Sequence, residues 1–243
     1  LEDRAVTAEE ARLAKAEPLM ARPTRRPDQL QVGQHFTEEV RRDLVLRFGV
    51  EQTTMGGLVV RTSLDPEIQT AAERALRDGL MNYDRRRGGW RGPVAKIAAS
   101  PTEWMPALAE QPRPPGALAN WRLAVVLEVK PQEARLGWLE RRDPRTPPEA
   151  PQGTLHFEDL RSWARPVLPD HRLGAEPRRM QDVVNPGDVV LVEYVAAEAA
   201  TRNRPARPER LVLRQMPQVE GAVVALDPQS GRVLAMAGGW AFE

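Results

Sequence analysis

Three pairs of carboxylates are the residues of this chain whose spacing could support acid–base chemistry. They are Glu9 with Glu10, Glu38 with Glu39, and Glu140 with Asp143. A glycosidase needs one carboxylic acid and one carboxylate on opposite sides of a glycosidic bond. Residues that are neighbours in a helix do not face each other across a cleft. We therefore interpret these pairs as surface residues, and we assign no catalytic residue to them.

A run of arginines with glycines and a tryptophan could bind polyanions. It is Arg85-Arg-Arg-Gly-Gly-Trp-Arg-Gly-Pro93. Arginines beside an aromatic ring can contact phosphates and stack on a base, as in proteins that bind single-stranded nucleic acid. Cations are also favoured at the carboxyl end of a helix, and short basic runs are commonly solvated surfaces. We favour this second interpretation.

Three tryptophans could form a platform on which sugars or bases stack. They are Trp121, Trp138 and Trp163. Tryptophan is also a large apolar residue, and a small domain with few other aromatics needs it for its core or rim. We therefore expect these residues to pack inside the domain.

The composition limits the class of protein. The 35 basic and 34 acidic residues leave a formal net charge of +1, so the charge balance does not require a polyanionic partner. The absence of cysteine excludes disulfides and thiolate metal ligands. Three histidines, His35, His156 and His171, are too few for a zinc site without cysteine. We predict no metal and no cofactor, and we interpret His156 as a packed or exposed strand residue rather than a base.

Targeting and membrane segments are not recognisable. No apolar run reaches the roughly 18 residues that a transmembrane helix needs, and there is no signal peptide. The composition fits a cytosolic or a periplasmic protein equally well. Because the first residue is Leu1, a targeting element can precede this sequence.

Two helices are expected first along the chain. Thr7 has capping-box spacing and predicts a helix that Pro18 ends, followed by a linker to Gln34. The second helix is predicted from Thr37, as its N-cap, to about Phe48, where the following glycine stops it.

A strand and a further helix follow. The β-branched run at 57–63 predicts the strand. Asp65 is a typical N-cap and Pro66 suits the first helical position, which predicts a helix to about Tyr83. The apolar stripe of this helix is expected to consist of Ile68, Ala72, Ala75, Leu76 and Tyr83.

Five short apolar or alternating runs predict a small β-barrel. They cover residues 122–129, 134–140, 152–157, 188–195 and 209–215. Residues 158–164, after the third run, predict a short helix with Leu160 and Trp163 on one side. Five strands with a helix after the third is the layout of an oligonucleotide/oligosaccharide-binding (OB) barrel. The proline-rich segment at 93–119 allows one short helix.

A β-hairpin is predicted near the end of the chain. Residues 222–226 and 233–237 flank a turn that begins at Asp227. Neither run alternates apolar with polar residues, so both faces are expected to be buried in a layered sheet. Because only four residues follow Gly239, we expect a fragment that ends inside a larger domain.

The order of the elements predicts an α+β fold with the barrel inserted into another sheet. The strand residues 58–61 are expected to lie beside the terminal hairpin, and the helix at 66–83 is expected to cover one hairpin face. The other face is expected to be bare. Inserted domains often have neighbouring termini, which makes this arrangement feasible.

Eight segments carry motifs that are similar to those of one family. They are residues 6–19, 57–69, 72–80, 83–86, 91–93, 186–190, 215–217 and 221–239. Together they resemble bifunctional class A penicillin-binding proteins of the 1A type. Residues 57–93 resemble the segment after that family's glycosyltransferase domain, and residues 215–239 resemble the point where its transpeptidase domain resumes.

The resemblance implies four parts. Residues 1–36 would be the tail of the glycosyltransferase region and a linker, and residues 37–93 a linker and the start of the transpeptidase. Residues 94–218 would form the inserted OB-like barrel with proline-rich loops. Residues 219–243 would begin the main transpeptidase sheet.

The family joins lipid-linked disaccharides into glycan strands and cross-links their stem peptides through a penicillin-sensitive serine. A serine activated by lysine requires Ser-x-x-Lys, with the family's Ser-x-Asn and Lys-Thr-Gly elements. Three residues after Ser63, Ser100, Ser162 and Ser230 stand Pro66, Glu103, Arg165 and Val233. No Lys-Thr-Gly occurs. The resemblance therefore implies an enzyme, a peptidoglycan glycosyltransferase and DD-transpeptidase, whose two active sites lie outside this chain.

Two functions remain open at this point. The first is a non-catalytic interdomain region of a peptidoglycan synthase that serves the cell wall and cell shape, in the periplasm, with an inner-membrane anchor outside this sequence. Its partners would be the glycosyltransferase and transpeptidase domains, a periplasmic or outer-membrane regulator and glycan strands, without nucleic acid. The alternative is an OB-type module that binds single-stranded nucleic acid or oligosaccharide. The predicted strands carry acids beside their few bases, whereas a groove that follows a nucleic-acid backbone is net positive.

Overall fold

The computed structural model describes residues 7, 9, 12, 13, 15, 32–97, 103–141, 146–197, 199, 200, 205, 206 and 208–240. The chain divides into two units, Leu1–Gln31 and Val32–Glu243. Of the five described residues in the first unit, Thr7 is not helical, and Glu9, Arg12, Leu13 and Lys15 are helical. The rest of the helix and linker predicted there lies outside the described residues. All elements below belong to the second unit.

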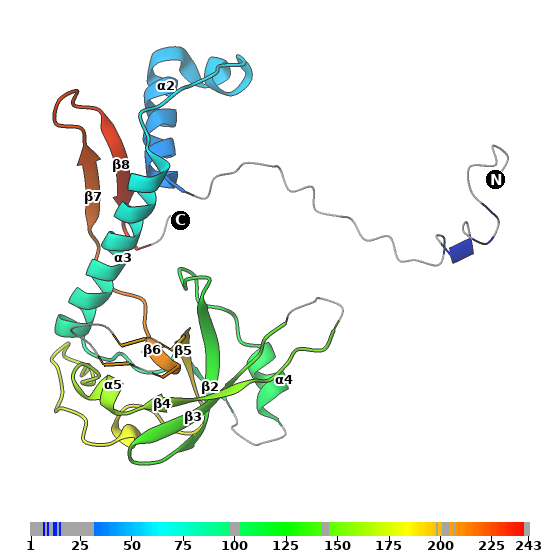
Figure 1. The fold of residues 1–243 in the computed structure, drawn as a ribbon, viewed down its shortest axis with the longest axis vertical. Coiled ribbons are helices and arrows are strands. Elements are labelled where there is room, and N and C mark those ends of the chain that lie inside the picture. Colours follow the sequence, from blue (N-terminus) through cyan, green and yellow to red (C-terminus); the bar gives the residue numbers. More distant parts are fainter. Residues whose placement is uncertain are drawn as a thin grey trace. The chain divides into compact units, whose positions relative to one another are not determined.

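The predicted barrel is present and closed (Figure 1). Its strands are β2 (Trp121–Val129), β3 (Glu133–Trp138), β4 (Gln152–His156), β5 (Asp188–Val195) and β6 (Arg210–Arg214). They pair in the order β5-β2-β3-β4-β6, and β6 returns to β5. The β4–β6 pair is parallel and the other barrel pairs are antiparallel. The predicted α+β fold with an OB-like barrel is therefore confirmed.

Short elements complete the barrel unit. A two-residue strand, β1 (Ala95–Lys96), pairs with β5. Helix α4 (Trp104–Ala109) is the single short helix expected among the prolines, and α5 (Glu158–Arg161) follows β4 as predicted. A 3-10 turn, η1 (Met180–Asp182), precedes β5. Among the described residues, no helix is long and apolar enough to cross a membrane.

The barrel has a core inside and a second apolar cluster outside. Alternate residues of β2, such as Ala124 and Val126, point inward to Leu136, Leu155 and Leu213. Val125 of β2 points outward and, with its partner Val189 of β5, packs against Trp104 and Leu108 of α4. Strands β2 and β5 are thus buried on both faces, which explains their continuous apolar sequences.

The three tryptophans considered as a stacking platform are buried, as we expected. Trp121 is fully buried, and Trp138 and Trp163 are each 9% exposed. The ring of Trp121 lies 5.5 Å from that of Trp240, which follows β8. The Trp240 indole N–H donates to the Gly116 carbonyl oxygen at 2.8 Å. All three rings are packed inside the domain, and Trp121 connects the barrel to the segment that follows β8.

Helix α3 (Pro66–Arg87) begins as predicted and extends one turn beyond Tyr83. The Asp65 carboxylate accepts hydrogen bonds from the amides of Glu67 and Ile68, which is the geometry of an N-cap. The predicted apolar stripe was only partly right, because Ala75 and Tyr83 are exposed. The buried residues recur every three or four positions and include two polar ones; they are Gln69, Ala72, Leu76, Leu80 and Asp84.

The strand predicted at 57–63 is absent, and this prediction was wrong. Residues 57–65 form no ladder, and Val59 is 89% exposed. Only the end of the segment reaches the hairpin, where Ser63 Oγ donates to the Val233 carbonyl and Asp65 N donates to the Leu234 carbonyl. The next residue, Pro66, has no amide hydrogen and starts a helix, so pairing cannot continue. A β-branched sequence is not sufficient without a partner edge.

The terminal hairpin consists of β7 (Ala222–Leu226) and β8 (Val233–Gly238), as predicted. Its turn is capped by Asp227, which accepts from the Gln229 amide and the Ser230 hydroxyl. Helix α3 packs on the face that carries Ala235 and Ala237 (Figure 1). The opposite face is partly covered by the start of α2 and leaves Val224 48% exposed. It is therefore less bare than we expected.

Helix α2 (Gln34–Met55) differs from its predicted bounds at both ends. Its N-cap is Gly33, not Thr37, because the Thr37 amide already donates to the Gly33 carbonyl oxygen at 2.8 Å. The Gly33 amide itself donates to the Glu73 carboxylate of α3. Gly49 breaks the helix with φ 79° and ψ 167°, but helical residues resume after it. The glycine therefore makes a kink where the sequence predicted an end. Phe48, where the predicted helix ends, lies inside α2 and is exposed.

We expect the carboxyl of Glu38 in α2 to titrate far below its ordinary range. Its hydrogen bond from Arg41, with Arg42 adding to it, lowers the pKa from 4.5 to about 2. A depressed carboxyl pKa adds stability above pH 4.5 that is lost as the pH falls toward about 2. NMR titration should show a midpoint near 2 that moves toward 4.5 in Arg41→Gln. A midpoint near 4.5 in the unchanged chain would contradict the ion pair.

Candidate functional site

The chain passes between α3 and the barrel twice, and both passages meet at one buried carboxylate. Asp84, in the last turn of α3, is 2% exposed. Both of its oxygens accept from the guanidinium of Arg91, each at 2.9 Å. Arg91 lies on the passage into the barrel, and it also donates to the carbonyl oxygen of Met216 on the passage out. We call this group, with Gln215, the α3–barrel joint.

Gln215 completes the joint. Its side-chain amide donates to Asp84 Oδ2 at 2.8 Å and to the Gly89 carbonyl oxygen at 2.6 Å. Its carbonyl oxygen accepts from the Arg91 amide, and the Gln218 amide donates to Asp84 Oδ1, each at 3.3 Å. A buried ion pair is stable only when further hydrogen bonds satisfy its remaining donors and acceptors. The joint meets this condition with residues from both passages.

The glycine and tryptophan of the arginine-rich run are structural parts of the same joint. Gly89 has φ 64°, and a Cβ there would lie 2.6 Å from the Arg165 carbonyl oxygen. Trp90 is buried, and its indole N–H donates to the Val183 carbonyl oxygen at 3.0 Å. Its ring meets that of Trp163 edge to face. The run is therefore not a solvated surface throughout, because its glycine and tryptophan pack inside the domain.

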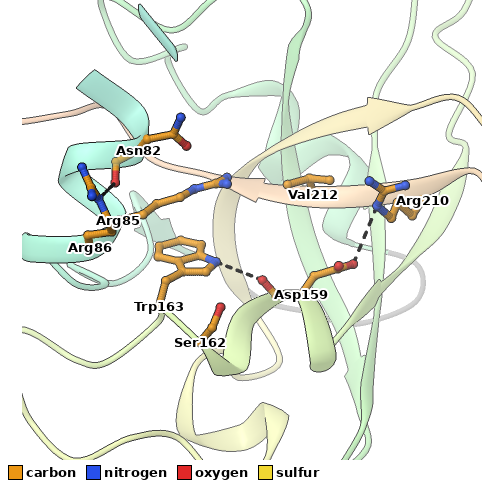
Figure 2. A pocket seen from close by; sticks show the side chains of 8 residues that line it. All are labelled: Asn82, Arg85, Arg86, Asp159, Ser162, Trp163, Arg210 and Val212. Carbon is orange, nitrogen blue, oxygen red and sulfur yellow. Dashed lines mark hydrogen bonds and ion pairs between the residues drawn. The ribbon is translucent and has the colours of Figure 1, made fainter. Parts of the chain in front are cut away.

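A pocket of about 790 Å³ lies beside the joint (Figure 2). It is lined by Asn82, Arg85, Arg86, Asp159, Ser162, Trp163, Arg210 and Val212. The guanidinium carbon of Arg85 lies 5.0 Å from the centre of the Trp163 ring, over its face. Asp159 faces Arg210 at 3.9 Å. The pocket thus joins the last turns of α3 to α5 and β6 of the barrel.

Arg85 is the most perturbed basic group of the pocket. Burial, together with the nearby charge of Arg214, lowers its pKa to about 10. Arg214 itself forms a 2.6 Å ion pair with Glu193. At neutral pH Arg85 therefore carries its charge in a partly desolvated position.

The carboxylate pairs do not form an acid–base site in the described part of the chain. Glu38 and Glu39 form exposed ion pairs with Arg41 and Arg42 on their own helix. The Glu140 carboxylate lies 3.6 Å from Arg122. Glu10 and Asp143 lie outside the described residues.

The histidines and serines lie apart. His35 starts α2 near Gly238, His156 is exposed on β4, and His171 occupies a turn with φ 62°. Among the residues that the structure describes, no cluster of histidine and acidic side chains could hold a metal ion. Ser63 and Ser230 donate within the hairpin region, Ser162 lines the pocket, and Ser100 lies outside the described residues.

Sequence reasoning missed the joint, although one indication was available. Asp84 follows Leu80 by four residues and therefore continues the buried stripe of α3. A carboxylate on a buried stripe requires a cationic partner. The motifs at 83–86, 91–93 and 215–217 were identified separately, and the structure shows that they meet at this carboxylate.

A closed five-stranded barrel, attached to helix α3 through a buried joint, defines an OB-like domain inserted between α3 and the terminal hairpin. The sequence profile of the family described as "Penicillin-binding protein OB-like domain" matches residues 90–219. The chain belongs to this family. The resemblance to penicillin-binding proteins of the 1A type is confirmed.

Individual relatives agree with this assignment. The Penicillin-binding protein 1A of Rickettsia typhi is 30% identical over 243 residues, which make up 100% of this chain and 26% of the relative. The proteins of the same name from Pseudomonas aeruginosa and Escherichia coli are each 28% identical, over 86% of this chain and 22% of their own length. The chain spans about a quarter of the length of the curated relatives it matches.

Proposed function

We propose that this chain is a non-catalytic interdomain region of a bacterial peptidoglycan synthase. In this role residues 94–218 form an inserted accessory domain, and residues 37–93 and 219–243 belong to the transpeptidase module. The family membership and the similarity to Penicillin-binding protein 1A along the whole chain support the proposal. The catalytic serine and the glycosyltransferase residues are proposed to lie in other parts of the full-length protein.

The observation that carries this proposal is the α3–barrel joint. Asp84, Arg91 and Gln215 fix the entry and the exit of the barrel to the same turn of α3. Trp240, after β8, adds a further contact through Trp121. A domain fixed in this way keeps a defined orientation on its carrier, whereas flexible linkers would let it move. Such a domain is suited to act as a spacer or a docking surface.

The hairpin offers one edge for the rest of a transpeptidase sheet. The outer edge of β8 is occupied by Ser63, Asp65 and Gln69, whose side chains or amides bind its backbone. In the described part of the chain, β7 pairs only with β8. The remaining strands are therefore proposed to join at β7, because an unpaired strand edge accepts another strand.

The proposed setting of the full-length protein is the periplasm, with an anchor in the inner membrane. Its partners in this role are the glycosyltransferase and transpeptidase domains of the same protein. We further propose that the barrel surface docks a periplasmic or outer-membrane regulator, or glycan strands, because OB-type barrels expose a strand face and loops that commonly bind ligands.

Deletion of the barrel from the full-length protein tests this role. Replacing residues 94–213 with a short glycine-serine linker retains Asp84, Arg91 and Gln215. Labelling by fluorescent penicillin should persist, because the active sites are proposed to lie elsewhere, while the yield of cross-linked glycan should fall. Unchanged glycan synthesis, together with no envelope protein retained by the isolated chain, would refute the accessory role. Loss of penicillin labelling in a folded deletion variant would refute the non-catalytic assignment.

A further inference from the structure

The pocket of Figure 2 carries more positive than negative charge. Three arginines, Arg85, Arg86 and Arg210, and a single carboxylate, Asp159, line it. The carboxylates around it are engaged elsewhere: Asp84 binds Arg91, and Glu193 binds Arg214. The Asp159–Arg210 contact is loose, at 3.9 Å. The end of the pocket formed by α3 is therefore cationic.

Arg85 has no anionic partner among the described residues. Its guanidinium donates one hydrogen bond, to the carbonyl oxygen of Leu213 at 3.2 Å, and stacks on Trp163. A guanidinium has five N–H donors, so most of its capacity is unused by the described chain. The carboxylates of Glu193, Asp159 and Asp84 attract this charge from a distance without pairing with it, and the cost of burying the guanidinium beside Arg214 still exceeds their attraction. An anion in the pocket would remove this cost.

Other donors surround the same space. Within the part of the chain that the structure describes, Arg86 forms a single long hydrogen bond, 3.4 Å, to the Asn82 carbonyl oxygen of its own helix. The side-chain amide of Asn82 and the hydroxyl of Ser162 form no hydrogen bond with the described residues. Figure 2 shows Arg85 extending over Trp163, Arg86 turned back toward the Asn82 carbonyl oxygen, and Asp159 on the far side of Trp163 from Arg86.

This arrangement selects one class of anion. Two guanidinium groups suit a planar carboxylate, which accepts paired hydrogen bonds from the arginine fork. Asp159 disfavours a dense negative charge such as phosphate, but its carboxylate can accept a hydrogen bond from a ligand amide N–H. We propose that the pocket binds a short peptide through its free carboxylate, held by Arg85 and Arg86, with a peptide N–H directed to Asp159. This inference goes beyond the accessory role and does not depend on it.

Titration of the chain with defined small ligands tests the proposal. The probes are N-acetyl-alanyl-alanine, its C-terminal amide and inorganic phosphate, followed by NMR through the Trp163 indole N–H and the Ser162 amide. The free acid should shift both signals and bind about tenfold or more tightly than the amide, because charge-assisted hydrogen bonds are lost in the amide. No shift with the acid, equal binding of the amide, or phosphate binding as tight as the acid would each overturn the proposal.

Three matched variants locate the binding site. Arg85→Gln and Arg86→Gln should each weaken binding of the free acid about tenfold or more. Arg87→Gln, an exposed neighbour that does not line the pocket, should leave it unchanged. Because Arg85→Gln also removes the stacking on Trp163, its fold is checked by thermal unfolding. Arg86 is exposed and not part of the core, so unchanged binding in Arg86→Gln would overturn the proposal whatever Arg85→Gln does.

Discussion

Asp84→Ala is expected to lower the free energy of unfolding by about 3–5 kcal/mol, the cost of leaving one partner of a buried ion pair without the other. Arg91 would keep its charge at a position where its side chain is 19% exposed. The side-chain amide of Gln215 and the main-chain amide of Gln218 would lose their acceptor at the same time. Urea unfolding followed by tryptophan fluorescence measures this loss, because Trp90 lies next to the joint.

Asp78→Ala provides the matched control for this experiment. Asp78 lies on the same helix and is exposed, so the change should alter stability by no more than about 0.5 kcal/mol. If Asp84→Ala lowered the free energy of unfolding no more than Asp78→Ala does, Asp84 and Arg91 would not hold the two passages together. The proposed spacer role would then lose its structural basis.

Gln69→Leu is expected to loosen the contact between β8 and α3. It should lower the free energy of unfolding by about 2–4 kcal/mol, because two backbone groups lose their hydrogen-bond partners. The Gln69 side chain is fully buried. Its amide donates to the Met236 carbonyl oxygen at 2.9 Å, and its carbonyl oxygen accepts from the Met236 amide at 2.8 Å. The Gln69 side chain therefore makes the two hydrogen bonds to Met236 that the backbone of a neighbouring strand would otherwise make. Hydrogen exchange of the Met236 amide measures the effect directly.

Gln34→Leu is the matched change at an exposed position of α2. It should leave the exchange of Met236 unaffected, because Gln34 does not contact β8 through any described hydrogen bond. Strong protection of Met236 that persists in Gln69→Leu would show that another group covers the β8 edge. The inference that new strands join at β7 would then need revision.

The barrel could be predicted from sequence because its strands are defined by local patterns. The five runs were placed within a few residues of β2 to β6, and the helix after β4 was expected. The terminal hairpin followed from its capped turn at Asp227. The segment at 57–63 misled us because its β-branched residues favour strand locally, whereas the structure places them without a partner strand. Pairing is a property of the neighbours and cannot be derived from one run.

The site was much less predictable than the fold. Gln215 and Asp84 are 131 positions apart, and no periodicity connects residues across an inserted barrel. The carboxylate on the buried stripe of α3 indicates that Asp84 needs a cationic partner. Because the sequence contains 35 lysines and arginines, it does not identify which of them is that partner. The interpretation of residues 85–91 as solvated surface holds for the exposed Arg86 and Arg87. It is wrong for Trp90, which is buried by residues distant in sequence, and for Arg91, which binds Asp84 and Met216.

The meeting of the two passages at Gly89 and Gln215 has a consequence for the entropy of assembly. These residues are 126 positions apart, yet they share a hydrogen bond. Docking the hairpin on α3 while the insertion is unfolded closes a long loop, at an entropic cost of about 4 kcal/mol. Once the barrel has folded and brought its ends together, the remaining closure is equivalent to a loop of about five residues and costs about 1.5 kcal/mol. A folded insertion thus makes the surrounding sheet easier to complete than an unfolded one.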